Sequence, residues 1–131
     1  MATFDDVARI ALSLPESAEL PLHGDRSWRV KDKMFVWERP LRKTDLAKLG
    51  DEAPEGPILG VRTDGLDAKE ALLADDPAVL FTIPHLNGYP AVLVLLDLVE
   101  LDELRELITD AWLSRAPKRL AAAFIAEHGE H

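Results

Sequence analysis

The chain contains no cysteine among its 131 residues. This absence excludes disulfides, thiolate zinc sites and a cysteine nucleophile together. Long apolar runs are also missing, since an uninterrupted run such as residues 91–96 is far below the roughly 20 residues that span a bilayer. The first residues, 1–6, carry two acids and no apolar core, so they do not form a signal peptide. We therefore expect no disulfide framework, no membrane contact and a cytoplasmic location.

What remains is the composition of an ordinary globular domain. Hydrophobic residues make up 47% of the chain. A chain of this length buries roughly two thirds of its unfolded surface on folding, so it needs no metal or disulfide to be stable. We expect a single domain over residues 1–131.

The charge is acidic overall but unevenly distributed. The formal net charge is −9, yet residues 26–48 hold eight bases and three acids, a local charge of +5. Such a segment has two interpretations. It is a solvated surface where bases cluster by chance, or it steers an anionic partner, because screening over about 8 Å isolates it from distant acids.

The first half of the chain predicts a helix followed by strands. Thr3 and Asp6 approximate a capping box, apolar residues recur at helical spacing, and Pro15 ends a helix over residues 4–13. Residues 27–30 and 34–38 are rich in aromatic and β-branched residues and read as strands joined by a turn at Lys31-Asp32-Lys33. In the second strand Phe35 and Trp37 are expected to face one way, with the alternate residues facing the other.

The second half alternates between strands and helices. A long loop over 39–56, with a short helix at 44–49, precedes a strand at 58–61 and a helix at 66–73. A short strand at 81–83, a loop at 84–90 and a buried strand at 91–98 follow. A helix at 102–112 and another from Pro117, with Leu120, Phe124 and Ile125 packing inward, end the chain. This order predicts an α+β fold with a mainly antiparallel sheet and helices packed against it.

Several short motifs resemble one known family when taken in order. They are Phe4-Asp5-Asp6-Val7, Trp28-Arg29-Val30, Lys33-Met34-Phe35, Pro84-His85, Gly88-Tyr89-Pro90 and Ala116-Pro117-Lys118-Arg119-Leu120. Over residues 3–125 the chain resembles the MmcQ/YjbR-like proteins, although Asp32 stands where many members have glycine. The resemblance implies a double-wing domain similar to the frataxin-like (CyaY-like) fold, and a DNA-binding label. Because a fold does not imply a function, the label is analogy.

The first candidate function is nucleic-acid binding. Phosphate contact requires several bases on one face, because each neutralised phosphate releases counterions. Bases gather on the predicted hairpin, in the loop after it and at the junction of the last two helices. The candidate contacts are Arg26, Arg29, Lys31, Lys33, Arg39, Arg42, Lys43, Lys118 and Arg119. The alternative is that these side chains are solvated or cap carbonyls and that Trp28 belongs to the core.

The second candidate function is a pocket for a small ligand or a protein partner. Trp37, His85, Asn87 and Tyr89 would supply an aromatic wall with a few polar groups. The alternative is that His85 and Tyr89 hydrogen-bond the loop backbone and hold it in place.

Metal binding and catalysis have little support in the sequence. Asp102, Glu106 and Asp110 share a helix face, but carboxylates in such a row rarely enclose a hard cation. The histidines are scattered, and no phosphate-binding glycine loop or catalytic motif is present. We expect a non-enzymatic binding protein without a metal or cofactor, present as a monomer or weak dimer.

Overall fold

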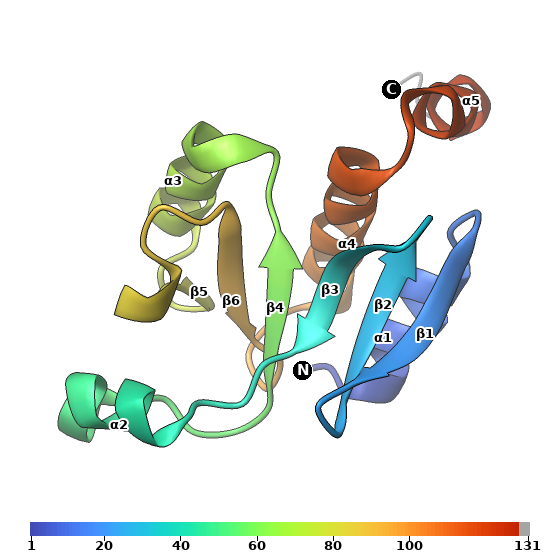
Figure 1. The fold of residues 1–131 in the computed structure, drawn as a ribbon. Helices are drawn as coiled ribbons and strands as arrows, with labels where there is room; N and C mark the ends of the chain where they lie inside the picture. Colours follow the sequence, from blue (N-terminus) through green and yellow to red (C-terminus); the bar gives the residue numbers. More distant parts are fainter. Residues whose placement is uncertain (129–131) are drawn as a thin grey trace.

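A computed structural model describes residues 1–128 and shows one antiparallel sheet of six strands with helices against it (Figure 1). The strands are β1 (Ser17–Leu22), β2 (Asp25–Val30), β3 (Lys33–Glu38), β4 (Ile58–Arg62), β5 (Leu80–Phe81) and β6 (Ala91–Leu95). The helices are α1 (Phe4–Leu12), α2 (Lys43–Leu49), α3 (Gly65–Asp75), α4 (Leu101–Arg115) and α5 (Lys118–His128), with short 3-10 turns η1 (Gly50–Glu52) and η2 (Pro84–Leu86). The strand order is β1-β2-β3-β4-β6-β5, which confirms the expected α+β class.

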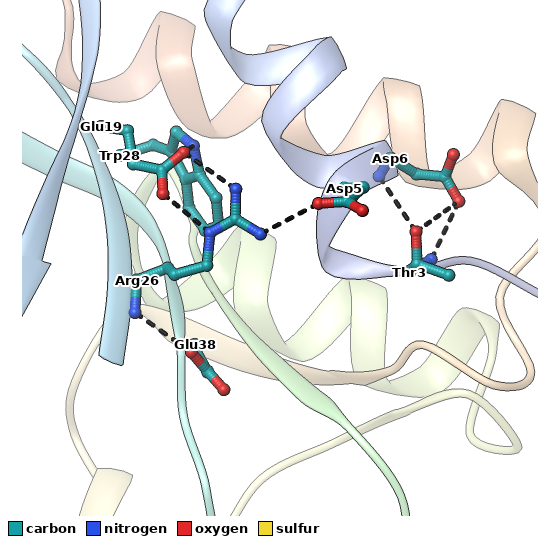
Figure 2. A network of polar contacts seen from close by, with 7 residues as sticks. All are labelled: Thr3, Asp5, Asp6, Glu19, Arg26, Trp28 and Glu38. Carbon is teal, nitrogen blue, oxygen red and sulfur yellow. Dashed lines mark hydrogen bonds and ion pairs between the residues drawn. The ribbon is translucent and has the colours of Figure 1, made fainter. Parts of the chain in front are cut away.

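Helix α1 begins at the predicted capping box. The backbone N–H of Asp6 donates to Thr3 Oγ1 at 3.2 Å, and the backbone N–H of Thr3 donates to Asp6 Oδ2 at 2.9 Å (Figure 2). Two of the otherwise unpaired amide groups at the helix start are thereby satisfied. Val7, Ile10 and Ala11 then turn into the core.

Strand β1 is missing from the sequence-based prediction. It contains Glu19 and Pro21 and most of its residues are exposed, so it carries no alternating apolar pattern. It pairs with β2 along one side only, and an edge strand tolerates a proline because one row of its backbone groups faces outward. The chain turns between β1 and β2 at His23 and Gly24, which both have positive φ.

The β2–β3 hairpin lies where it was expected, but the register of β3 differs. Lys31 and Asp32 both adopt positive φ, as the tight turn requires. A bulge then shifts the register, so Phe35 and Val36 are both buried in the main core. The prediction that Phe35 and Trp37 share a face is therefore wrong. Trp37 packs instead against Gly60 of β4, where a Cβ atom would overlap its indole ring.

The main core lies between the sheet and helices α1, α3 and α4, which cover one side of it (Figure 1). Trp112 of α4 is fully buried there, and its Nε1 donates to the carbonyl of Pro15 at 3.1 Å. A smaller cluster, formed by Ile58, Ile83, Leu86 and Leu93, lies against α2 and η2. No helix among residues 1–128 has the length and apolarity needed to cross a membrane.

Helix α5 packs more loosely than expected. It has no buried residue, and its main anchor is Phe124, whose ring centroid lies 5.0 Å from that of Trp112. Leu120 is half-buried, as predicted, whereas Ile125 is 50% exposed, so the prediction that it packs inward is wrong. The helix is therefore held at a few points rather than along a continuous face.

Carboxyl groups crowd together where α3 ends near the start of α4. Burial, the hydrogen bond and charge of Asp76, and the charges of Asp75 and Glu106 raise the pKa of Glu103 to about 7, from a usual value of 4.5. The pKa of Glu103 is therefore higher in the folded state than in the unfolded state. Protonation of Glu103 stabilises the fold fully below pH 4.5, and this contribution is lost as the pH rises through about 7.

We therefore expect Glu103→Gln to be more stable than the wild type at pH 8 and nearly equal to it at pH 4.5. The gain at pH 8 should be about 1 kcal/mol, well below the full effect of the pKa shift because the carboxyl is partly exposed. Urea unfolding at both pH values measures it, with the exposed Glu70→Gln on α3 as the control. A difference that does not change with pH would contradict the assignment.

Candidate functional site

Arg26, the first of the predicted nucleic-acid contacts, is already bound by carboxylates of the chain. Its Nε and Nη2 donate to Glu19 at 2.7 and 3.0 Å, and Nη1 donates to Asp5 at 3.3 Å (Figure 2). The hydrogen bond to Glu19 leads the effects that raise the pKa of Arg26, and its guanidinium lies 5.3 Å from the ring centroid of Trp28. Trp28 is itself fully buried, as the core interpretation expects. Arg26 therefore ties β1, β2 and α1 together.

Arg39 is also engaged inside the protein. It is buried, and its Nη2 donates to Asp45 Oδ2 at 3.1 Å. The same oxygen accepts from the backbone N–H of Arg42 at 2.9 Å, which caps α2. Burial alone would raise the pKa of Asp45, but these partners hold it below its usual value. This buried pair fixes the start of α2 rather than presenting a charge to a ligand.

The remaining predicted bases are more exposed. Lys31 pairs with Glu16 at 3.3 Å across the hairpin. The other predicted contacts have no ion pair within residues 1–128; they are Arg29, Lys33, Arg42, Lys43, Lys118 and Arg119. Two of them, Lys33 and Lys118, line one cavity, so the hairpin and the helix junction contribute to the same site.

This cavity, which we call the basic cavity, has a volume of about 750 Å³. The end of β4, the start of α3, the end of α4 and the start of α5 meet at one end of the molecule and enclose it (Figure 1). Its polar lining includes Lys33, Arg62, Asp64, Asp110, Arg115 and Lys118. Bases outnumber acids in this set, which makes the cavity a local exception on an acidic protein.

Two arginines without a carboxylate partner give the cavity its charge. Arg62 is the last residue of β4 and Arg115 the last residue of α4, and neither forms an ion pair within the described part of the chain. Burial, together with the nearby charge of Arg62, lowers the pKa of Arg115, while Tyr89 opposes the shift. The Nε atoms of both arginines are buried without a hydrogen-bond partner. The fold thus places two arginines without a carboxylate partner in the lining of one cavity.

Tyr89 joins this pair from the loop after η2. Its hydroxyl accepts a hydrogen bond from Arg62 Nη1 at 3.2 Å, and the guanidinium lies 5.0 Å from the ring centroid. A phenol ring in this position orients Arg62 without neutralising it. Tyr89 was predicted as a ligand contact; its hydroxyl contacts Arg62, and the residue itself does not line the basic cavity.

The other members of the predicted pocket lie apart from one another. Trp37 is buried against Gly60, and His85 is exposed on η2, which packs against α2. Asn87 lines a separate cavity of about 300 Å³ beside α3. The structure therefore does not bring the four predicted residues into one pocket.

Lys69 holds the loop that carries Tyr89. Its Nζ donates to the carbonyls of Leu86 and Tyr89, both at 2.7 Å, from a buried position on α3. Burial lowers the pKa of this amine. In the sequence, Lys69 lies on the apolar face of the predicted helix, and this position was the signal that its amine turns toward the protein.

Residues 1–128 contain no group of three or more metal-ligating side chains that could hold an ion. Asp110, from the row of acids considered for a metal, lines the basic cavity instead. Burial, then the charge of Glu106, raises the pKa of Asp110. The described lining of the cavity thus combines four bases with two acids, Asp64 and Asp110.

The fold is similar to that of a solved Deinococcus radiodurans protein with a DUF419 domain. The TM-score is 0.67 at 24% sequence identity, and the match covers 100% of this chain and 96% of that one. This likeness defines the class of fold.

The model of the YjbR family matches residues 12–114, and the chain belongs to that family. It is also 54% identical over 132 residues to uncharacterized proteins of Mycobacterium tuberculosis and Mycobacterium bovis, with 98% of this chain and 100% of each relative covered. The expected family and α+β fold are therefore confirmed, while the CyaY-like description stays a prediction.

The buried Arg39–Asp45 pair allows a direct test of whether Arg39 is structural. Arg39→Met leaves Asp45 charged and buried, so we expect it to lower the free energy of unfolding by about 3 kcal/mol. Arg42→Met, at an exposed base of the same segment, should cost no more than about 0.5 kcal/mol. Urea unfolding measures both. Equal small losses would show that Arg39 is free to serve a ligand.

Proposed function

We propose that this protein binds a small anionic ligand in the basic cavity and that it does so without catalysis, as a cytoplasmic monomer or weak dimer. The observation that carries the proposal is that Arg62 and Arg115 both line this cavity and that neither has a carboxylate partner within residues 1–128. A protein gains no stability from placing like charges together in a partly buried site. A bound carboxylate or phosphate would convert that repulsion into two charge-assisted hydrogen-bonded contacts.

The lining of the cavity favours binding over chemistry. The hydroxyl of Thr63 donates to the carbonyl of Gly65 at 2.8 Å, and that of Ser114 donates to the carbonyl of Ala111 at 2.7 Å. Both hydroxyls are therefore already engaged with the backbone, and no histidine lines the cavity among the described residues. Neither hydroxyl is paired with a side-chain base in the way that an activated nucleophile is.

The proposal predicts an anion-dependent gain in stability that depends on both arginines. Thermal unfolding is measured with sodium phosphate, citrate, benzoate and octanoate at constant ionic strength. We expect at least one of these anions to raise Tm in a saturable manner, and Arg62→Gln or Arg115→Gln to weaken that binding about tenfold or more. Because Arg115→Gln removes a partly buried charge, its Tm without ligand should not fall.

Arg119→Gln is the matched control, since Arg119 belongs to the same helix junction but does not line the cavity. It should bind the anion as the wild type does. No saturable binding by any of the four anions, or equal binding by the Arg62 and Arg115 variants, would overturn the proposal.

Nucleic-acid binding is the second candidate, and one observation favours it. Lys33 of the hairpin and Lys118 of the helix junction line the same cavity, so members of two of the three predicted basic groups lie at one site. Against it, Arg26, Lys31 and Arg39 are paired with the protein's own carboxylates. The remaining predicted bases belong to a chain of net charge −9, and only Lys33 and Lys118 of them line the cavity.

Fluorescence anisotropy with labelled single- and double-stranded DNA tests this candidate. If it holds, binding at about 50 mM salt should weaken tenfold or more at about 200 mM, because released counterions drive the association. It should also be lost in Lys33→Glu/Lys118→Glu but kept in the exposed Lys48→Glu control. No binding at the lower salt concentration would eliminate nucleic acid and leave the cavity ligand.

A further inference from the structure

The apolar part of the basic cavity carries information about the ligand. Helix α3 presents Ala68, Ala71 and Leu72 to the cavity, at positions that share one helix face. Leu107 and Leu113 of α4 form another part of the wall. An apolar lining of this kind gains from contact with an apolar ligand, because water is displaced from both surfaces.

Small side chains keep this space open. Alanines at 68 and 71 on α3 and at 116 and 121 around the start of α5 all line the cavity. Ala71 is exposed although it lies on the apolar face of its helix. Larger residues at these positions would fill the volume with the protein's own side chains. The chain instead leaves a hollow with apolar walls beside its arginine pair.

The other lining residues offer little to a sugar or a nucleobase. Thr63 and Ser114 already donate to backbone carbonyls, so they offer no free hydroxyl donor to a sugar. Among the described residues, no aromatic side chain lines the cavity, so a nucleobase would have no ring to stack on. Asp64 and Asp110 also line it and would repel a second anionic group placed near them.

From these observations we propose that the ligand is an anionic amphiphile, with one terminal carboxylate or phosphate on an apolar body. The anionic group lies at Arg62 and Arg115, and the apolar body lies along α3 and α4 beneath the start of α5. This inference rests on the proposed function, because it assigns the charged end of the ligand to the same two arginines.

A series of carboxylates of increasing length tests the apolar body. Acetate, butanoate, hexanoate and octanoate are titrated below their micelle concentrations, followed by amide NMR shifts or calorimetry. Each methylene buried against the wall should raise the affinity about threefold. Octanol, which lacks the negative charge, should bind more weakly than octanoate. Comparing the affinities of octyl phosphate and octanoate shows which head group the site prefers.

A matched pair of variants locates the apolar body. Ala71→Phe fills the cavity and should weaken octanoate binding at least tenfold while leaving acetate binding largely unchanged. Ala74→Phe is the control, since Ala74 is exposed on the same helix and does not line the cavity. Circular dichroism checks that both variants fold. The chain-length series on the wild-type protein tests the proposal even if one of these variants does not fold.

Two different failures are distinguishable. Arginine-dependent binding of phosphate or acetate that shows no increase with chain length would overturn the amphiphile and leave the anion site in place. If neither the short nor the long anions bind in a manner that needs Arg62 and Arg115, the proposed function and this inference both fall.

Discussion

The packing of Trp112 is the constraint on which the site depends. This fully buried side chain donates to the carbonyl of Pro15, just after α1, and packs against Phe124 of α5. It therefore joins α4 to the beginning and to the end of the chain at one point. Arg115 follows one turn later, so the same packing fixes where its backbone lies beside the basic cavity. The place of Arg115 in that lining is therefore a consequence of the core rather than of a carboxylate partner.

An unfavourable contact that the core imposes indicates a role outside folding. Two guanidiniums near each other lower the stability of the fold, and burial strengthens the effect by lowering the effective dielectric constant. Arg26 and Arg39, by contrast, are balanced by the carboxylates of Glu19 and Asp45. Arg62 and Arg115 have no such partner within residues 1–128. Active and binding sites are where proteins keep such unbalanced charge, since the ligand supplies the missing partner.

The sequence predicted much of the fold because local signals were strong. The Thr3–Asp6 capping box and the turn at Lys31-Asp32 are formed as expected, since each depends on neighbouring residues. Strand β1 was missed because an exposed edge strand has no apolar alternation to detect. The bulge in β3 was missed because it arises from pairing with β2 and from packing, which a period of two along one strand does not encode.

The site was harder to predict, because its residues meet only in three dimensions. Lys118 and Tyr89 were singled out, but Arg62 was not, although a charged residue ending the apolar strand β4 was a usable signal.

The excess of acids elsewhere in the chain fits a small ligand in the cavity better than a nucleic-acid surface. A long polyanion meets the field of the whole protein, whereas a small anion inside a cavity responds to the charges within a Debye length of it. For an acidic protein with one basic hollow, the size of the ligand therefore decides whether attraction or repulsion prevails.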